Sequence, residues 1–302
     1  ELSLWKIMVP HHMGQYPAVS RAVREGHLSE GSPAHAERFS EADIFTGKDE
    51  RVDYDPWLGA VGPIVKSFDG GTTETLNVAD FTDGDFVYST TGELAWNTNG
   101  WYKILAKKSQ GIVGQAGPGN ISLSDIEVEL TTSFVSLLFT SLDDRPISES
   151  GSVLITAMAQ DKQTGTIYNS DQTQIIELGG PPLLMEPVQA TITLDGDSIE
   201  EVQILDEHGI PRGTVNDING NTFVIDGRWE TAWYHIVREV PDEESETNDE
   251  TDTGDEVDTG DNEEDTVVKD GTGCGCSTGG KPIGLVWILG VLGLVRLRRR
   301  ED

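Results

Sequence analysis

The stretch LAWNTNGWYKI, residues 94–104, has the pattern of two β-strands joined by a tight turn. Asn99-Gly100 supplies the positive φ angles that a short hairpin turn requires. Trp96 and Trp101 flank the turn, where aromatic side chains stabilise paired strands. The sequence therefore predicts an antiparallel hairpin at this point.

Short runs of the same kind continue from about Trp57 to Val240. They are apolar or alternate between apolar and polar residues, turn residues separate them, and helical periodicity is weak. A second Asn-Gly pair, Asn219-Gly220, again lies between β-type runs. This spacing is typical of an all-β sandwich, so we expect a mainly β fold. The strand candidates are DFVYST, GELAWN, WYKILAK, GIVGQ, IEVELT, FVSLLFTS, SVLITAMAQ, QIIELG, VQATITL, EVQILD, NTFVIDG and TAWYHIVRE.

The beginning of the chain differs from this pattern. QYPAVSRAVREGHL, residues 15–28, has apolar side chains at helical spacing and then Gly26, which predicts a short helix. Its own segment offers this helix no partner, so we expect an exposed apolar patch around residues 1–30. The apolar positions of the helix are Tyr16, Val19, Ala22 and Val23.

The C-terminal end carries a short apolar run, Ile283 to Val295. As a helix these residues would span roughly 20 Å, less than the roughly 30 Å hydrocarbon core of a bilayer. The run is either a short transmembrane helix or a buried core helix. The acidic sequence before it and the arginines after it favour the membrane, with the arginines on the cytoplasmic side. These arginines are Arg296, Arg298, Arg299 and Arg300.

Cys274-Gly275-Cys276, a small-residue spacer, the short span and the arginine cluster resemble the MYXO-CTERM type of C-terminal sorting signal, found on surface proteins of myxobacteria and relatives. The resemblance implies processing near Cys274 and Cys276 with lipid attachment, loss of the span, and display on the cell surface or outer membrane of a Gram-negative bacterium. The tail departs from the usual pattern by ending in Glu301-Asp302. Because the chain begins with Glu1 and shows no signal peptide, we expect the front of the natural, secreted protein to be missing.

Composition sets further limits. Roughly half of Asp242 to Asp270 is acidic, which predicts a disordered, self-repelling tether. Both cysteines lie in the tail, so the folded part has no disulfide framework. A formal charge of −32 without a basic stripe argues against nucleic acid as a partner. We therefore expect four parts, which are a helical remnant at 1–50, a β-sandwich at 51–241, an acidic linker at 242–273 and the sorting signal at 274–302.

A second resemblance concerns the body. STTGELAWNTNGWYKILAKKSQGIVGQAG, the stretch from VELTTSF to GTIYN, and PPLLMEPVQATITL are similar in order to the C-terminal region of secreted bacterial glycoside hydrolases with a TIM-barrel catalytic domain. The matching motifs include Gly92-Glu93-Leu94, Val113-Gly114, Ser141-Leu142-Asp143 and Thr164-Gly165. LSLWKIMVPHHMGQYPAVSRAVREGHL resembles the end of the barrel. The resemblance covers roughly residues 1–200 and implies that residues 1–50 are a barrel remnant.

The resemblance also implies that the catalytic carboxylates lie in strands that precede this chain, so we assign no catalytic residue. Glu93 and Glu127 have the positions of solvated strand residues. DFTDGDF, residues 80–86, is either an acidic turn or a weak calcium loop, with the turn favoured. His11 and His12 are adjacent and make a poor metal pair, and Ser133 and Ser141 lack the serine hydrolase elbow. We expect no metal site and no cofactor.

Aromatic side chains carry the remaining indication of function, because sugar rings pack on tryptophan and tyrosine faces. The carbohydrate-contact candidates are Trp96, Trp101, Trp229 and Trp233. The alternative for each is an ordinary place in the core. In WETAWYH, strand alternation predicts that Trp229 and Trp233 share one face and that Tyr234 takes the other.

These observations support two functions. In the first, the chain is the C-terminal, non-catalytic portion of a cell-surface glycoside hydrolase acting on polysaccharide, and is inactive alone. In the second, it is a stand-alone surface-anchored β-sandwich that binds glycan or a protein partner. A third possibility, a self-sufficient enzyme, lacks a paired acid motif. In each case the sorting signal makes the membrane a partner.

Overall fold

The structure is a computed structural model, which describes residues 14–46, 55–171 and 173–239. The fold is mainly β, as the sequence predicts. The acidic linker, Cys274, Cys276, the apolar run and the terminal arginines all lie outside the described residues. Within the described ranges no helix is long and apolar enough to cross a bilayer.

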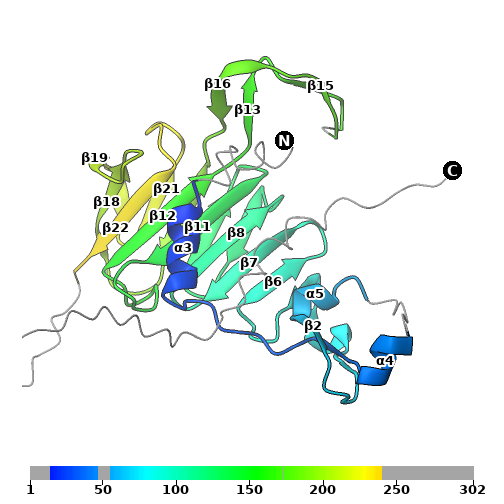
Figure 1. Cartoon of the computed structure of the whole chain (residues 1–302). Coiled ribbons are helices and arrows are strands. Elements are labelled where there is room, and N and C mark those ends of the chain that lie inside the picture. The colour runs from blue at the N-terminus through cyan, green and yellow to red at the C-terminus, as the bar shows by residue number, and fades with distance from the viewer. Residues whose placement is uncertain (1–13, 47–54, 172, 240–302) are drawn as a thin grey trace, which may run out of the picture. The chain divides into compact units, whose positions relative to one another are not determined.

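Two antiparallel sheets form the body (Figure 1). Every one of the twelve predicted strand runs contains a strand. The larger sheet has the order β19 (Pro211–Thr214), β18 (Ile199–Leu205), β22 (Trp233–Arg238), β12 (Ser152–Met158), β11 (Val135–Ser141), β8 (Ser109–Gly114), β7 (Trp101–Ala106), β6 (Leu94–Asn97), β5 (Phe86–Tyr88) and β4 (Thr82–Asp83). The smaller sheet has the order β20 (Ile218–Asn219), β21 (Thr222–Ile225), β17 (Ala190–Leu194), β10 (Ile126–Leu130) and β9 (Gly119–Ser122).

The two sheets pack face to face around one apolar core. Phe139 and Ile155 of the larger sheet and Ile192 and Phe223 of the smaller sheet belong to the same cluster, and each is at most 1% exposed. Side chains on the inner faces alternate with outward-facing ones along each strand. The arrangement is a β-sandwich, in agreement with the sequence prediction.

Both predicted hairpins form. β6 pairs with β7, and Gly100 in their turn has φ of +94°. β20 pairs with β21, and Gly220 between them has φ of +61°. Each glycine occupies the left-handed region that other residues rarely adopt, which explains why the Asn-Gly pairs mark these turns.

Helix α3 (Tyr16–Arg24) packs on strands β11 and β12 (Figure 1). It buries Ala18 and Ala22, while Tyr16 and Val23 stay exposed. The expectation of a helix without a partner is therefore wrong. Its partner is the face of the larger sheet that points away from the sandwich core, contributed by residues more than one hundred positions along the chain, so local sequence gave no sign of it.

A separate three-stranded sheet follows α3 in the chain. β1 (His35–Arg38) pairs in parallel with β2 (Ile64–Ser67) and antiparallel with β3 (Glu74–Thr75). It therefore joins residues on both sides of the expected division at residue 50. The neighbouring short helices are α4 (Glu41–Thr46), α5 (Leu58–Val61) and η1 (Val78–Phe81).

An arm of two consecutive strand pairs connects β12 of the larger sheet with β17 of the smaller one. β13 (Asp161–Thr164) pairs with β16 (Gly180–Met185), and farther out β14 (Ile167–Tyr168) pairs with β15 (Ile175–Glu177). In Figure 1 this arm projects beyond the ends of the sandwich strands. We refer to residues 161–185 as the arm.

Candidate functional site

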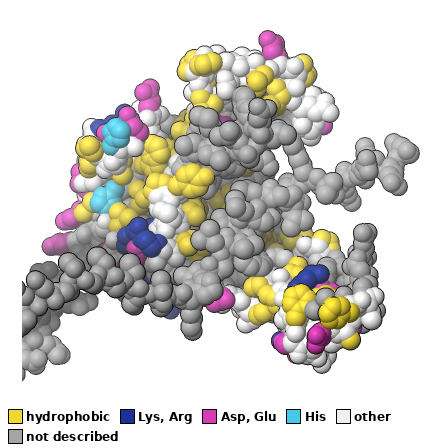
Figure 2. All heavy atoms as spheres, in the orientation of Figure 1, with side chains coloured by type: hydrophobic (Ala, Val, Ile, Leu, Met, Phe, Trp, Pro, Cys, Tyr) yellow, Lys and Arg dark blue, Asp and Glu magenta, His cyan; other side chains and the backbone are white. Residues whose placement is uncertain are grey.

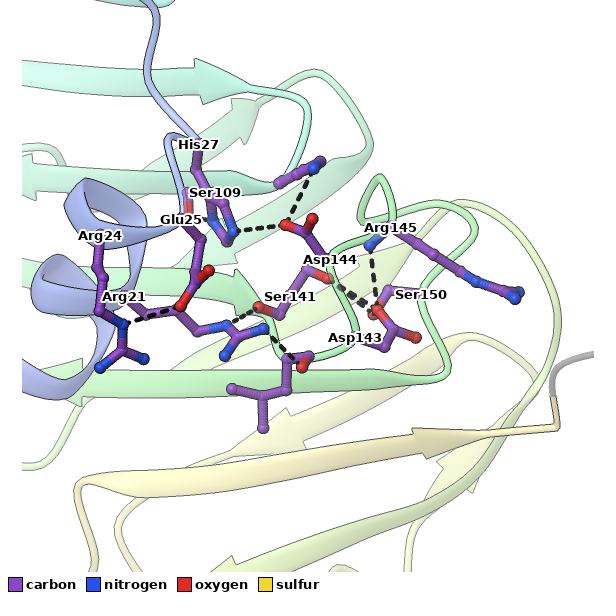
Figure 3. A network of polar contacts seen from close by, with 12 residues as sticks. Arg21, Arg24, Glu25, His27, Ser109, Ser141, Asp143, Asp144, Arg145 and Ser150 are labelled. Atoms are coloured by element: carbon purple, nitrogen blue, oxygen red, sulfur yellow. Dashed lines mark hydrogen bonds and ion pairs between the residues drawn. The ribbon is translucent and has the colours of Figure 1, made fainter. Parts of the chain in front are cut away.

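The loop between β11 and β12 is organised around the carboxylate of Asp143 (Figure 3). Its Oδ1 accepts hydrogen bonds from the hydroxyls of Ser141 at 2.8 Å and Ser150 at 2.7 Å, and its Oδ2 accepts one from the amide of Gly151 at 2.8 Å. Partial burial works to raise the pKa of Asp143, but these donors together outweigh burial and lower it. The loop thus has a fixed shape, closed by an ionised carboxylate.

The end of helix α3 binds this loop. Arg21 donates from Nε to the carbonyl of Ser141 at 2.7 Å and from Nη2 to the carbonyl of Leu142 at 2.6 Å. At the other end of the helix, Trp233 Nε1 donates to the carbonyl of Gly14 at 3.0 Å. The helix is therefore fastened to the sheet at both ends by polar contacts, in addition to the burial of its alanines.

His27, just after the helix, extends the network. Its Nδ1 lies 2.8 Å from the hydroxyl of Ser109 in β8. Its Nε2 lies 3.3 Å from Asp144, in ion-pair range although not aligned as a hydrogen bond, and Lys108 Nζ lies 2.9 Å from the same carboxylate oxygen. A carboxylate beside Nε2 favours a proton on that nitrogen, which leaves Nδ1 to accept from Ser109.

The environment of His27 favours its neutral form. Burial lowers its pKa most, the nearby Asp144 carboxylate acts in the opposite direction, and the cations Arg21 and Lys108 lower it further. The balance is a pKa below the ordinary value of 6.5. The pKa of Asp144 is lowered, mainly by its hydrogen bond from Lys108.

Ser109, His27 and Asp144 follow one another as in an acyl-transfer relay, but the geometry does not suit that chemistry. Ser109 is 6% exposed and His27 is 5% exposed, so a substrate carbonyl has no approach to the hydroxyl. The cluster instead holds the segment that follows α3 against β8. Sequence reasoning missed it because the three residues are far apart in the chain.

Two of the carbohydrate-contact candidates lie on opposite faces of the β6–β7 hairpin. Trp96 stacks on Tyr102 with ring centroids 4.6 Å apart, and burial raises the pKa of Tyr102 to about 12. Trp101 packs partly against the sandwich core. Its ring contacts that of Phe86 edge to face, with the ring centroids 5.2 Å apart. The hairpin therefore separates the two tryptophans.

Lys103 lies over the aromatic rings near Trp101. Its Nζ is 4.8 Å from the centroid of Phe86 and 5.8 Å from that of Trp101, and it donates to the carbonyl of Ser122 in β9. Phe86, Tyr88, Trp101 and Lys103 form what we call the aromatic shelf, beside the end strand of the smaller sheet. All four side chains are partly exposed.

Trp229 and Trp233 do not share one face of one strand, so the alternation argument was wrong for this pair. Strand β22 begins at Trp233, and Trp229 lies in a turn before it. Trp229 packs against the sandwich core, whereas Trp233 bonds to Gly14 on the opposite face of the sheet. The positive φ of Glu230, +49°, marks the change of direction that the sequence did not reveal.

Glu93 and Glu127, which were also considered from the sequence, accept hydrogen bonds from neighbouring serines. Glu93 accepts hydrogen bonds from the amide of Ser29 at 2.6 Å and its hydroxyl at 2.9 Å, and Glu127 accepts one from Ser122 at 2.8 Å. The acidic segment at residues 80–85 includes the end of η1, the whole of β4 and the turn that leads into β5. In the part of the chain that the structure describes, no three His, Cys, Asp or Glu side chains are grouped to hold a metal ion.

No family model, no curated protein and no solved structure matches this chain.

Proposed function

We propose that this chain is the C-terminal, non-catalytic portion of a cell-surface glycoside hydrolase acting on polysaccharide, with the catalytic barrel preceding the sandwich. The observation that carries the proposal is the fastening of residues 14–29 to the larger sheet. Gly14, Arg21, His27 and Ser29 each make a polar contact with it or with a loop or strand end beside it. A connection held at four points transmits the orientation of whatever domain it joins, as an accessory module requires.

The carboxylates of Asp143 and Asp144 support a non-catalytic role for this chain. A glycosidase needs a carboxylic acid that stays protonated near neutral pH, beside a second carboxylate. Asp143 and Asp144 are adjacent, but the pKa of each is lowered and each is occupied by its own partners. Neither has the properties of a general acid.

The first test is to sequence the source DNA upstream of the codon for Glu1. We expect an in-frame extension that encodes alternating strand and helix patterns after a signal peptide. We also expect the 302-residue chain to show no turnover of aryl glycosides. Turnover that a single carboxylate substitution in this chain abolishes would contradict the proposal, as would a stop codon followed by a start and a signal peptide ending at Glu1.

The aromatic shelf favours the second candidate, a stand-alone surface module that binds glycan. Partly exposed rings beside a strand edge offer flat apolar faces, and Lys103 adds a hydrogen-bond donor. Affinity electrophoresis against a panel of polysaccharides tests it. Under this candidate, Phe86→Ala reduces retention about tenfold, roughly 1.4 kcal/mol. The control Phe45→Ala, at an aromatic 82% exposed on another element, leaves retention unchanged.

Surface display through the C-terminal signal remains part of the proposal. Substitution of Cys274 and Cys276 by serine should leave the chain unprocessed and without lipid, so that it keeps its apolar span and terminal arginines and runs as a larger species in the membrane fraction. Immunoblotting of fractionated cells, with surface protease treatment of whole cells, measures the size and the display. A double variant of unchanged size that is still displayed on the surface would contradict the assignment of these cysteines.

A further inference from the structure

The arm carries eight of the sixteen large apolar side chains that are exposed in the described residues. Its large side chains are between 36% and 69% exposed. Figure 2 shows hydrophobic side chains gathered on this projecting part. The residues are Ile167, Tyr168, Ile175, Ile176, Leu178, Leu183, Leu184 and Met185.

These side chains occupy both faces of the arm. Successive residues of a strand point to opposite faces, so Leu183 and Met185 lie on one side and Leu184 on the other. A two-stranded ribbon has little independent stability in water and needs a further strand or a packing partner. An arm with two exposed apolar faces therefore offers a surface on which an apolar segment can pack.

The chain itself brings an apolar segment within reach of the base of the arm. Gly14 is held by Trp233, which pairs with Thr156 of β12. From Thr156 to Asp161, where the arm begins, the extended chain covers about 17 Å. The thirteen residues before Gly14, ELSLWKIMVPHHM, can reach about 45 Å, enough to extend along the arm. Their large apolar side chains include Leu2, Leu4, Trp5, Ile7, Met8 and Val9.

We propose that the arm is a docking surface for the chain segment that directly precedes Gly14, residues 1–13. A tethered segment has an effective concentration in the millimolar range, which a separate partner must exceed. A second copy of this chain is disfavoured, because each copy carries a formal charge of −32.

Hydrogen exchange on the full-length chain tests the proposal. The double substitution Leu4→Asp with Ile7→Asp puts two charges into the segment. We expect exchange of the arm amides, residues 161–185, to accelerate about tenfold, while exchange in β10 and β17 of the sandwich stays unchanged. Unchanged exchange in the arm overturns the proposal.

The reciprocal variant keeps the test independent of how the first one folds. Ile176→Asp with Leu184→Asp should raise the accessibility of Trp5 to collisional quenching, because coupling between two surfaces acts in both directions. The control Val224→Asp changes a side chain that is 41% exposed on β21, and should leave the quenching of Trp5 unaltered. Equal quenching in the arm variant and this control overturns the proposal.

Two further results decide against it. Arm protection in the wild-type chain that declines on dilution assigns the surface to a second copy. Arm amides that exchange at unprotected rates in the wild-type chain show that residues 1–13 do not cover it.

Discussion

Strand β12 and the arm follow one another in the chain, separated by Ala159 and Gln160, yet they meet opposite surroundings. In β12, Ile155 faces the sandwich core and Thr156 faces the other way, and both are 0% exposed. In the arm, consecutive residues of β16 such as Leu183 and Leu184 are each 45% exposed. Both strands are apolar. The exposure of a strand depends on how many layers of structure cover it. β12 lies between the smaller sheet and α3, whereas neither of these elements covers the arm.

The largest effect that tests this comparison comes from removing one large side chain from each region. Phe139→Ala in β11 should cost about 3–5 kcal/mol of unfolding free energy, because a fully buried ring is lost and a cavity remains. Ile176→Ala in the arm should cost far less, about 1 kcal/mol or below, because this side chain lies outside the packed core of the sandwich. Urea unfolding measures both. Similar losses at the two sites would break the comparison.

The next effect concerns helix α3, which covers β11 and β12. Arg21→Ala should cost about 2 kcal/mol, because charge-assisted hydrogen bonds to two carbonyls of the loop are lost. Arg24→Ala, three residues along the same helix, removes a side chain that is 72% exposed and bonded to the neighbouring Glu25. This control should lie within about 0.5 kcal/mol of the wild type. A loss as large as that of Arg21→Ala would mean that the helix is not fastened through Arg21.

A smaller effect appears at acid pH. The lowered pKa of Asp143 means that its carboxylate stabilises the fold above the unfolded value of 3.8, and that this contribution is lost as pH falls through the folded pKa. Asp143→Asn should therefore be less stable than the wild type at pH 7, with a difference that shrinks towards pH 2. Thermal unfolding across this range checks it. A difference that stays constant with pH would contradict the role of the ionised carboxylate.

The smallest effect is expected at His27. Its folded pKa lies below 6.5, so the unfolded state binds more protons between the two values and stability falls as pH drops through 6.5. His27→Asn should reduce this pH dependence without abolishing it, because burial also lowers the pKa of His235. His208→Asn, at an exposed histidine, is the matched control. Tm measured between pH 7.5 and 5.5 distinguishes the variants.

Much of the sandwich could be predicted, because its determinants are local. Alternation along IEVELT predicts that Ile126, Val128 and Leu130 share a face, and these three residues are buried in the core. The turn at Asn99-Gly100 could also be predicted, because the conformation of a tight turn depends on its own residues. The pairing of β1 with β2 could not be predicted, since HAER, residues 35–38, has no β-type pattern and depends on partners elsewhere.

The site was less predictable than the fold. Trp96, Trp101, Trp229 and Trp233 were chosen by residue type, but residue type does not reveal which face or which turn a tryptophan occupies. The network around Asp143 was missed for a different reason. Ser141 and Asp143 stood in a motif of the resemblance, but the hydrogen bonds that Asp143 accepts from Ser141 and Ser150 depend on the folded loop. The contact between His27 and Ser109 likewise joins residues that are far apart in the chain.

The place of β22 in the larger sheet has a consequence for the order in which the protein is made. The last described strand in sequence lies between β18 and β12, which were synthesised earlier. At about 5–20 residues per second, the ribosome needs roughly 4–15 s to proceed from Met158 to Trp233. During that interval the edge of β12 that later pairs with β22 has no neighbouring strand. A chain that ends before Trp233 lacks β22 and leaves the larger sheet in two separate parts with open edges, so the sandwich is completed only when nearly the whole body has been produced.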